Sequence, residues 1–143
     1  MRIKIEEPEK YFFSSLTKIK VSDLNYGNHL SNDKVLAFVH QARVELFQHW
    51  GYSEIDFGGS GVIMTDAAIV FLSEGKLNEE VRIEIGIRDL SRVGFDLCYR
   101  LVKTANGEQL ALVKTGIVCF DYHIKKVVSV PNDVKDIITT MMG

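Results

Sequence analysis

A long helical segment that is apolar on most of its circumference constrains this fold more than any other feature of the sequence. Between Ser31 and Gly51, apolar residues recur at helical spacing and leave only a narrow polar strip. Ser31 is a suitable N-cap, and Gly51 stands where glycine commonly ends a helix. A helix with apolar residues on so many sides is buried on most of them. The remainder of the chain is therefore expected to form a concave surface that covers it.

Strand-like segments make up most of the remaining chain. Residues 11–22 are expected to form a strand before the helix, and Asn132, just after Pro131, is expected to cap a short final helix. Further strands are expected after the long helix, at residues 62–72, 81–90, 95–103 and 110–122. Because short turns connect these strands, the sheet is predicted to be antiparallel. The predicted fold class is α+β, a single domain over residues 1–143 in which a curved sheet wraps around the long helix.

The hairpin before the last strand carries the most specific signal for register. Asn106-Gly107 is typical of a two-residue type I′ turn, in which both central residues have positive φ. Such a turn places Cys98 opposite Thr115 and leaves Cys119 too far from Cys98 for a disulfide. We therefore expect two free thiols, which are typical of the reducing cytoplasm.

Charge and hydropathy argue against several classes of partner. The chain has 17 Lys and Arg against 19 Asp and Glu, a formal charge of −2, and no basic block, so no nucleic-acid partner is expected. The longest apolar stretch, residues 62–72, is too short to span a bilayer. The first ten residues are charged and lack the apolar core of a secretory leader. We expect a cytoplasmic protein without a membrane partner.

Polar side chains gather in the connection between the first strand and the long helix. They are Asp23, Asn25, Tyr26, Asn28, His29, Ser31 and Asn32. The connection leads into a helix N-terminus, whose free N–H groups and dipole favour developing negative charge. A carboxylate, an imidazole and an oxyanion site are what the hydrolysis of a thioester requires. The same residue types also favour turns and caps, so composition alone leaves a purely structural role equally open.

The connection and the helix also resemble a known signature. The run VSDLNYGNHLSND, followed by VLAFVHQARVELF, resembles the pattern D-x-D-x-x-G-H-V-N-N of the 4-hydroxybenzoyl-CoA thioesterase-like hotdog family. Weaker similarities extend the resemblance over nearly the whole chain. It implies the hotdog fold and hydrolysis of an acyl-CoA or acyl-carrier thioester, with CoA as part of the substrate and no metal or bound cofactor. Because the edges of such a sheet are open, a homodimer or homotetramer is expected.

Residue by residue, the resemblance is incomplete at one important position. Asp23 and His29 match the first aspartate and the histidine, whereas Asn25 stands where many members carry the catalytic aspartate. An amide is neither a base for water nor a nucleophile. We therefore expect Asp23 or His29 to be the general base, with Asp23 orienting the ring or the water and Asn25 contacting the water or the thioester. Backbone N–H groups near Ser31 and Asn32 are expected to polarise the carbonyl.

Other residues are candidates for substrate contacts. Tyr26 and Asn28 belong to the same connection, and Asn28 stands at the position of the family's usual glycine. Asp66 interrupts an apolar strand, where it either sits at a strand irregularity or pairs with a nearby base, or else faces the active cleft of a neighbouring subunit. Arg88 and Arg92 either meet the phosphates of CoA or are exposed hairpin charges.

The asparagine at position 25 leaves a second function open. A hotdog domain without the usual aspartate is also compatible with non-catalytic binding of an acyl-CoA or an acyl carrier. Release of free thiol from short, medium and aromatic acyl-CoAs distinguishes hydrolysis from binding. A hydratase or dehydratase would be expected to have a longer loop before the helix than this sequence has.

Overall fold

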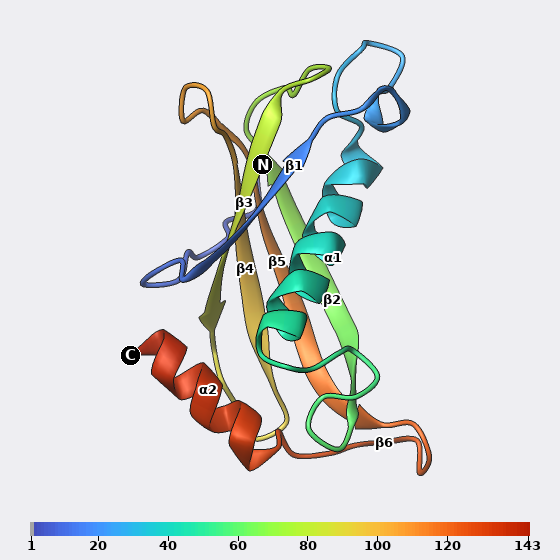
Figure 1. Cartoon of the computed structure of the whole chain (residues 1–143), viewed down its shortest axis with the longest axis vertical. Coiled ribbons are helices and arrows are strands. Elements are labelled where there is room, and N and C mark those ends of the chain that lie inside the picture. The colour runs from blue at the N-terminus through green and yellow to red at the C-terminus, as the bar shows by residue number, and fades with distance from the viewer. Residues whose placement is uncertain (1) are drawn as a thin grey trace.

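The computed structural model describes residues 2–143, and it shows the expected α+β architecture. A curved antiparallel sheet wraps around one long helix, and a short helix closes the C-terminus (Figure 1). The elements are β1 (Phe13–Lys18), α1 (Asn32–His49), β2 (Gly61–Phe71), β3 (Glu80–Arg88), β4 (Gly94–Lys103), β5 (Gln109–Asp121), β6 (Lys126–Val127) and α2 (Asn132–Met142).

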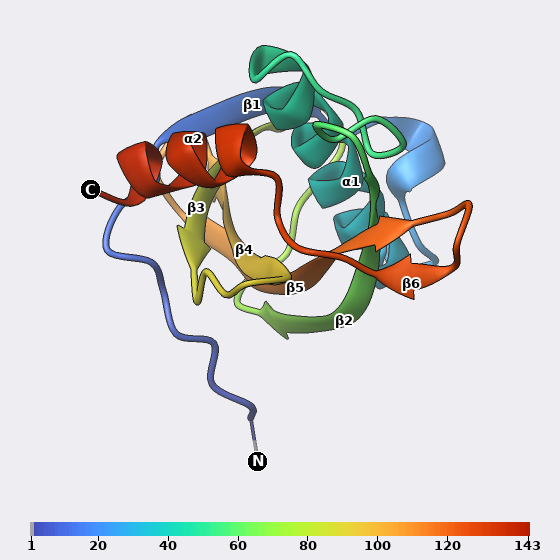
Figure 2. The same ribbon diagram turned by 90° about the horizontal axis from the view of Figure 1, so that it is seen from below.

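The sheet has the strand order β1-β3-β4-β5-β2, with the short β6 paired to β5. Each of these pairs is antiparallel, as expected from the short connections. Helix α1 lies on the concave face of this sheet, and the N-terminal segment crosses the opposite face (Figure 2). This is the hotdog fold, and it leaves β1 and β2 as the two outer strands.

Burial of α1 agrees with its nearly continuous apolar surface. Val39, Ala42, Leu46 and Phe47 are at most 1% exposed and pack into the core against the inner residues of the sheet. Gly51 follows the helix with φ +87°, the left-handed conformation in which glycine commonly ends a helix. Transferring this much apolar surface out of water is the main driving force for the fold.

The first strand is shorter than predicted. It ends at Lys18, and a 3₁₀ turn at Val21–Asp23 follows where the sequence predicted a continuous strand to residue 22. Val21, which begins this turn, is 73% exposed. The chain turns away from the sheet only after Ile19, whose backbone N–H donates to the carbonyl of Glu79 at 3.0 Å and whose carbonyl accepts the N–H of Asn78 at 2.9 Å.

The hairpin between β4 and β5 also differs from its prediction. Cys98 pairs with Lys114 rather than with Thr115, and an irregularity shifts the register after Leu101. Gly107 has φ +76°, whereas Asn106 is not among the residues with positive φ. The connection is therefore not a two-residue type I′ turn, and the register moves by one residue. Both cysteines are nevertheless free and buried.

The predicted N-cap of the final helix, Asn132, was one residue too late. Asn132 is the first helical residue, and Pro131 occupies the N-cap position. The sequence did not indicate β6, which consists of only two residues. Among residues 2–143, no helix is long and apolar enough to cross a membrane.

Candidate active site

Asp23 stabilises the polar connection between β1 and α1 through its side chain and its backbone. Its side chain is 6% exposed, and Oδ2 accepts a hydrogen bond from the backbone N–H of Lys20 at 2.8 Å. Its backbone carbonyl accepts the N–H of Ser31 at 2.8 Å, so the turn before the connection is tied to the residue that begins the helix. Both groups of Asp23 are therefore engaged in shaping the loop.

Asn25 folds the chain over the next four residues. Its Oδ1 accepts the backbone N–H groups of Gly27 at 3.0 Å and His29 at 3.2 Å. The backbone N–H of Asn25 donates to the carbonyl of His29 at 2.9 Å. Asn28 has φ 61°, a left-handed conformation that asparagine adopts more readily than most residues. This explains why asparagine is tolerated where the family signature carries glycine.

His29 contacts a carboxylate that the sequence did not identify. Its Nε2 lies 3.0 Å from Oε2 of Glu74, which follows β2. The two segments run side by side, because His29 forms a β-bridge with Lys76 and the N–H of Leu30 donates to the carbonyl of Gly75 at 2.7 Å. If Nε2 donates to Glu74, Nδ1 of the neutral ring is the proton acceptor.

Glycine at position 75 favours this close approach. A Cβ there would lie 2.6 Å from Cδ1 of Ile19 and 3.2 Å from Cβ of Leu30. The S-E-G sequence after β2 therefore combines a carboxylate with the residue that brings it near the imidazole. Sequence reasoning missed Glu74 because it belongs to a charged turn 45 positions after His29, and only the sheet brings the two together.

A cavity of about 240 Å³ lies beside this pair and the beginning of α1. Asn25, His29, Asn32 and Glu74 supply its polar wall, whereas Asp23 does not line it. The apolar part of its lining comes from Leu30, Val35, Phe71 and Leu110. The cavity thus joins an imidazole and a carboxylate to an apolar surface. An arrangement of this kind suits a ligand with a polar reacting group and an apolar portion.

The first turn of α1 borders the cavity through Asn32. Ser31 occupies the N-cap, but its side chain makes no capping hydrogen bond with the helix. Its hydroxyl instead contacts Oδ1 of Asp33, and this hydrogen bond lowers the pKa of the Asp33 carboxyl. The N–H groups of the first turn are consequently not capped by Ser31, as expected for a site that receives negative charge.

The structure therefore brings together only part of the predicted constellation. His29, Asn25 and Asn32 line one cavity, and Asn28 shapes the loop between them. Tyr26 is fully exposed and is not part of the cavity lining. The expected contact of Asp23 with the imidazole is not formed, since the carboxylate of Asp23 binds the N–H of Lys20. Glu74 is in contact with the ring instead.

Asp66 lies at an irregularity in β2, outside this cavity. Its carboxylate contacts Nζ of Lys114 at 2.8 and 2.9 Å and accepts the backbone N–H of Gly116 at 3.0 Å. The hydrogen bond from Lys114 lowers the pKa of the Asp66 carboxyl. The register shifts between Met64 and Asp66, which places the carboxylate against β5. Within one chain, Asp66 thus lies at a strand irregularity and pairs with a nearby base, as the structural alternative left open by the sequence expects.

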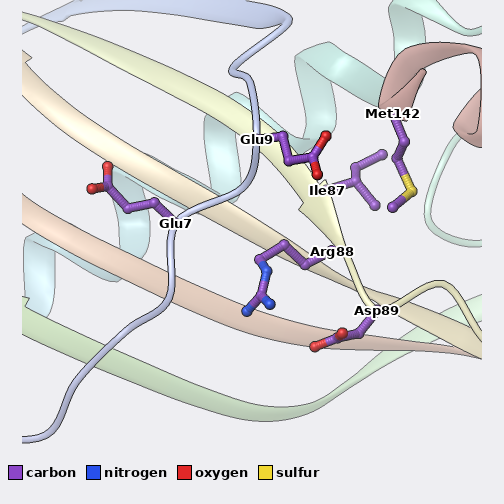
Figure 3. Close-up of a pocket in the computed structure, with 6 residues that line it drawn as sticks. All are labelled: Glu7, Glu9, Ile87, Arg88, Asp89 and Met142. Carbon is purple, nitrogen blue, oxygen red and sulfur yellow. The ribbon is translucent and has the colours of Figure 1, made fainter.

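Arg88 and Arg92 lie at the other end of the sheet. Strand β3 begins at Glu80, which pairs with the last residue of β1, and ends at Arg88. At about 3.3 Å per residue, Arg88 lies about 26 Å from Glu80. Nη2 of Arg88 is 2.6 Å from Oε2 of Glu6. Figure 3 shows Arg88 beside Asp89 in a cavity of about 350 Å³ that is also lined by Glu7, Glu9 and Met142. Neither arginine reaches the His29 cavity of its own chain.

Among residues 2–143, no group of three or more His, Cys, Asp or Glu side chains is arranged to hold a metal ion.

Comparison with known proteins gives one family match. The model of the thioesterase-like superfamily matches residues 19–138, which is most of the chain. No curated protein sequence matches significantly. The fold, in contrast, is similar to many solved structures.

Three of these structures illustrate the similarity. A 1,4-dihydroxy-2-naphthoyl-CoA thioesterase from Synechocystis, Slr0204, is 17% identical with a TM-score of 0.82, covering 92% of this chain and 98% of its own. The probable thioesterase YbaW from Escherichia coli is 15% identical with a TM-score of 0.78, covering 92% and 100%. SAV2348 from Staphylococcus aureus, solved in complex with CoA, is 13% identical with a TM-score of 0.84, covering 97% and 88%. At these identities the likeness shows the fold.

Proposed function

Because the chain belongs to the thioesterase-like superfamily, we propose that it hydrolyses the thioester of an acyl group carried on CoA or on a carrier protein. The single observation that carries this proposal is the pairing of His29 with Glu74, 3.0 Å apart, in a cavity at the start of α1. The CoA bound to the Staphylococcus aureus protein of the same fold supports a CoA thioester as the substrate.

In the proposed reaction, His29 is the general base. Nε2–H donates to Glu74, and the free Nδ1 accepts a proton from water as that water attacks the thioester carbonyl. The N–H groups of the first turn of α1, beside Asn32, stabilise the oxyanion. When the carbon–sulfur bond breaks, the departing thiolate takes the proton back from the imidazolium. The products are a carboxylic acid and a free thiol.

Asp23, Asn25 and Glu74 have distinct supporting roles in this proposal. The carboxylate of Glu74 fixes the tautomer of His29 and stabilises the imidazolium that forms. Asn25 holds the backbone of His29, so it positions the ring rather than accepting a proton. Asp23 acts one step further away, by tying the loop to the helix start.

We also propose that a second copy of the chain pairs along β2. Strand β2 ends the sheet order, so one of its edges has no partner strand in the described chain. Met64 is 48% exposed and Phe71 is 40% exposed, although both are apolar. Phe71 also lines the His29 cavity, so a partner chain on this edge would complete its wall.

Release of free thiol from a panel of acyl-CoAs tests the proposed reaction. His29→Ala is expected to lower kcat by about 100-fold or more, and Glu74→Gln by about tenfold. His40→Ala is the matched control, because His40 also contacts a glutamate, Glu54 at 2.8 Å, but is not part of the cavity lining. Activity of His29→Ala within threefold of the wild type would refute the assignment.

The alternative function is non-catalytic binding of an acyl-CoA or an acyl carrier. Asn25 favours it, because this amide stands where many members of the family have a catalytic aspartate. Calorimetric binding of acyl-CoA without thiol release from any substrate of the panel would support the alternative. Thiol release that depends on His29 would exclude it.

A further inference from the structure

The residues around the His29 cavity differ in burial between its polar and its apolar parts. The side chains of His29 and Glu74 are 33% and 68% exposed, so the polar pair lies at the mouth of the cavity. Val35 and Leu110 are 3% and 2% exposed, and they form an inner wall that we call the floor. An apolar acyl group that enters beside His29 is therefore removed from water most completely against these two residues.

Tightly packed side chains close the floor. An added Cβ at Gly75, which also lines the cavity, would lie 2.6 Å from Cδ1 of Ile19 and 3.6 Å from Cδ2 of Leu110. Even one additional carbon atom therefore finds no free space between Gly75 and Ile19. Val39, which follows Val35 by one helical turn on the same face of α1, is 1% exposed. The cavity consequently ends at the floor.

The backbone of the floor is held in place by hydrogen bonds. The carbonyl of Leu110 accepts the N–H groups of Leu72 at 2.9 Å and Ser73 at 3.3 Å. Oγ of Ser73 donates to the carbonyl of Gln109 at 2.7 Å. Val35 belongs to α1, whose inner face packs into the core. Because interiors of this kind are closely packed, the floor cannot move aside for a longer chain without disturbing these contacts.

The volume of the cavity limits the size of the acyl group. If each non-hydrogen atom occupies roughly 30 Å³, the share of one molecule in liquid water, a cavity of about 240 Å³ holds about eight such atoms. A hexanoyl group fits this volume, whereas a decanoyl group exceeds it. An acyl chain that is too long by even one methylene group is disfavoured about tenfold or more by a closed apolar pocket.

We propose that the His29 cavity accepts compact acyl groups of about the size of hexanoyl, and that Leu110 sets this limit. The inference rests on the thioester hydrolysis proposed above and specifies its substrate class. Leu110 is the specificity-determining residue because its side chain reaches the end of the cavity beside Gly75. Val35 shares the floor, but it lies at the beginning of α1, where a substitution would also disturb the N–H groups of the first turn.

Phe71 marks the other direction that a longer chain could take. It lines the same cavity and is 40% exposed on β2, which is an outer strand. A chain that followed this side would bury its methylene groups less completely than one that points towards Leu110, which is 2% exposed. The burial of the two walls therefore favours the floor.

Thiol release by the whole protein from butanoyl-, hexanoyl-, decanoyl- and hexadecanoyl-CoA tests the size limit. The wild type is expected to hydrolyse hexanoyl-CoA with a kcat/KM at least about tenfold above that for decanoyl-CoA. Leu110→Ala deepens the cavity and should bring the two values to within about threefold of each other. The matched control is Leu101→Ala, because Leu101 is 0% exposed but is not part of the cavity lining, so the preference should stay as in the wild type.

Thermal denaturation verifies that both variants are folded. Leu110→Val is the second variant if Leu110→Ala does not fold, and octanoyl-CoA is then the substrate expected to gain. Calorimetric binding of S-hexyl-CoA and S-decyl-CoA provides a measurement without turnover, since these thioethers cannot be hydrolysed. The wild type should bind S-hexyl-CoA at least about fivefold more tightly than S-decyl-CoA, and Leu110→Ala should reduce this difference.

The outcomes separate this inference from the proposed reaction. If no acyl-CoA releases thiol but the preference for S-hexyl-CoA is found, the reaction is wrong and the size limit stands. The size limit is wrong if the wild type prefers decanoyl- or hexadecanoyl-CoA, or if it binds neither thioether. It is equally wrong if folded Leu110→Ala keeps the preference of the wild type, or if Leu101→Ala changes it as much. A change of preference in Phe71→Ala but not in Leu110→Ala would place the acyl chain along β2 and would also overturn the inference.

Discussion

Removal of the Tyr99 hydroxyl is the sharpest test of how the core tolerates a buried charge. Arg43 is 5% exposed, and its Nη1 donates to the Tyr99 oxygen at 3.2 Å. That oxygen is also 2.8 Å from Oγ1 of Thr115, which is 0% exposed. Nε of Arg43 has no hydrogen-bond partner among the described residues, and the carboxylate of Glu54 lies 3.7 Å away. The Tyr99 oxygen is therefore a hydrogen-bond acceptor for the buried guanidinium of Arg43.

The expected cost of Tyr99→Phe follows from these contacts. A hydrogen bond to a charged group contributes about 1.5–3 kcal/mol, and the loss of a second, neutral bond adds about 1 kcal/mol. The substitution leaves the volume of the ring nearly unchanged, so no cavity term is added. The free energy of unfolding should fall by about 3 kcal/mol. At about 3 °C per kcal/mol for a chain of this length, Tm should fall by about 9 °C.

Thermal and urea denaturation followed by circular dichroism measure this change. Tyr52→Phe is the control, because no hydrogen bond of the Tyr52 hydroxyl is found among residues 2–143 and the ring packs on Phe57 at 5.5 Å. In Arg43→Met, the loss from Tyr99→Phe should shrink, since no buried charge needs the hydroxyl. A change below about 1 kcal/mol for Tyr99→Phe, or full additivity with Arg43→Met, would refute the reasoning.

Three further predictions concern other parts of the fold. Gly86→Ala should release the N-terminal segment and lower the free energy of unfolding by about 1–3 kcal/mol, since the Cβ of the alanine would lie 2.4 Å from Cγ of Pro8. Hydrogen exchange of the N-terminal segment should then become faster, and unchanged exchange would contradict this. Burial raises the pKa of Cys98 and Cys119 from 9.0 to about 11, so the stability that their neutral thiols contribute is present below 9.0 and is lost as the pH rises toward 11. Urea midpoints should therefore fall between about pH 8 and about pH 10, and less so when both cysteines are replaced by alanine. Met64→Lys should weaken self-association along β2 in sedimentation experiments, whereas equal sedimentation of variant and wild type would count against pairing on this edge.

Local chemistry explains why the architecture was predictable. The apolar circumference of α1 requires burial, and the strands after it alternate or run apolar, so a sheet around one helix is the arrangement that covers it. The family signature adds the functional class, because its first aspartate and its histidine occur in this order, at Asp23 and His29, before the helix. The family match over residues 19–138 agrees with that class.

Register and strand ends were less predictable, because they depend on long-range pairing. Asn106-Gly107 has the composition of a two-residue turn, yet only Gly107 takes positive φ, and the irregularity after Leu101 changes the pairing of Cys98. Similarly, the end of β1 at Lys18 coincides with the start of β3 at Glu80, its partner, so it depends on a segment far away in the sequence. A short turn preference of this kind is small compared with the burial of side chains across a whole sheet.

The sequence by itself determined the kinds of groups available, namely an imidazole, amides and a helix start in one connection. The tertiary structure decided which carboxylate meets that imidazole. Asp23 was the acid that the family signature places before the histidine, but the turn at its own position uses its carboxylate for a backbone N–H. Glu74 reaches His29 because the end of β2 lies against the connection, with Gly75 permitting the approach. Hydrogen bonding is decided by distance in space, and sheet pairing sets that distance for residues far apart in the sequence.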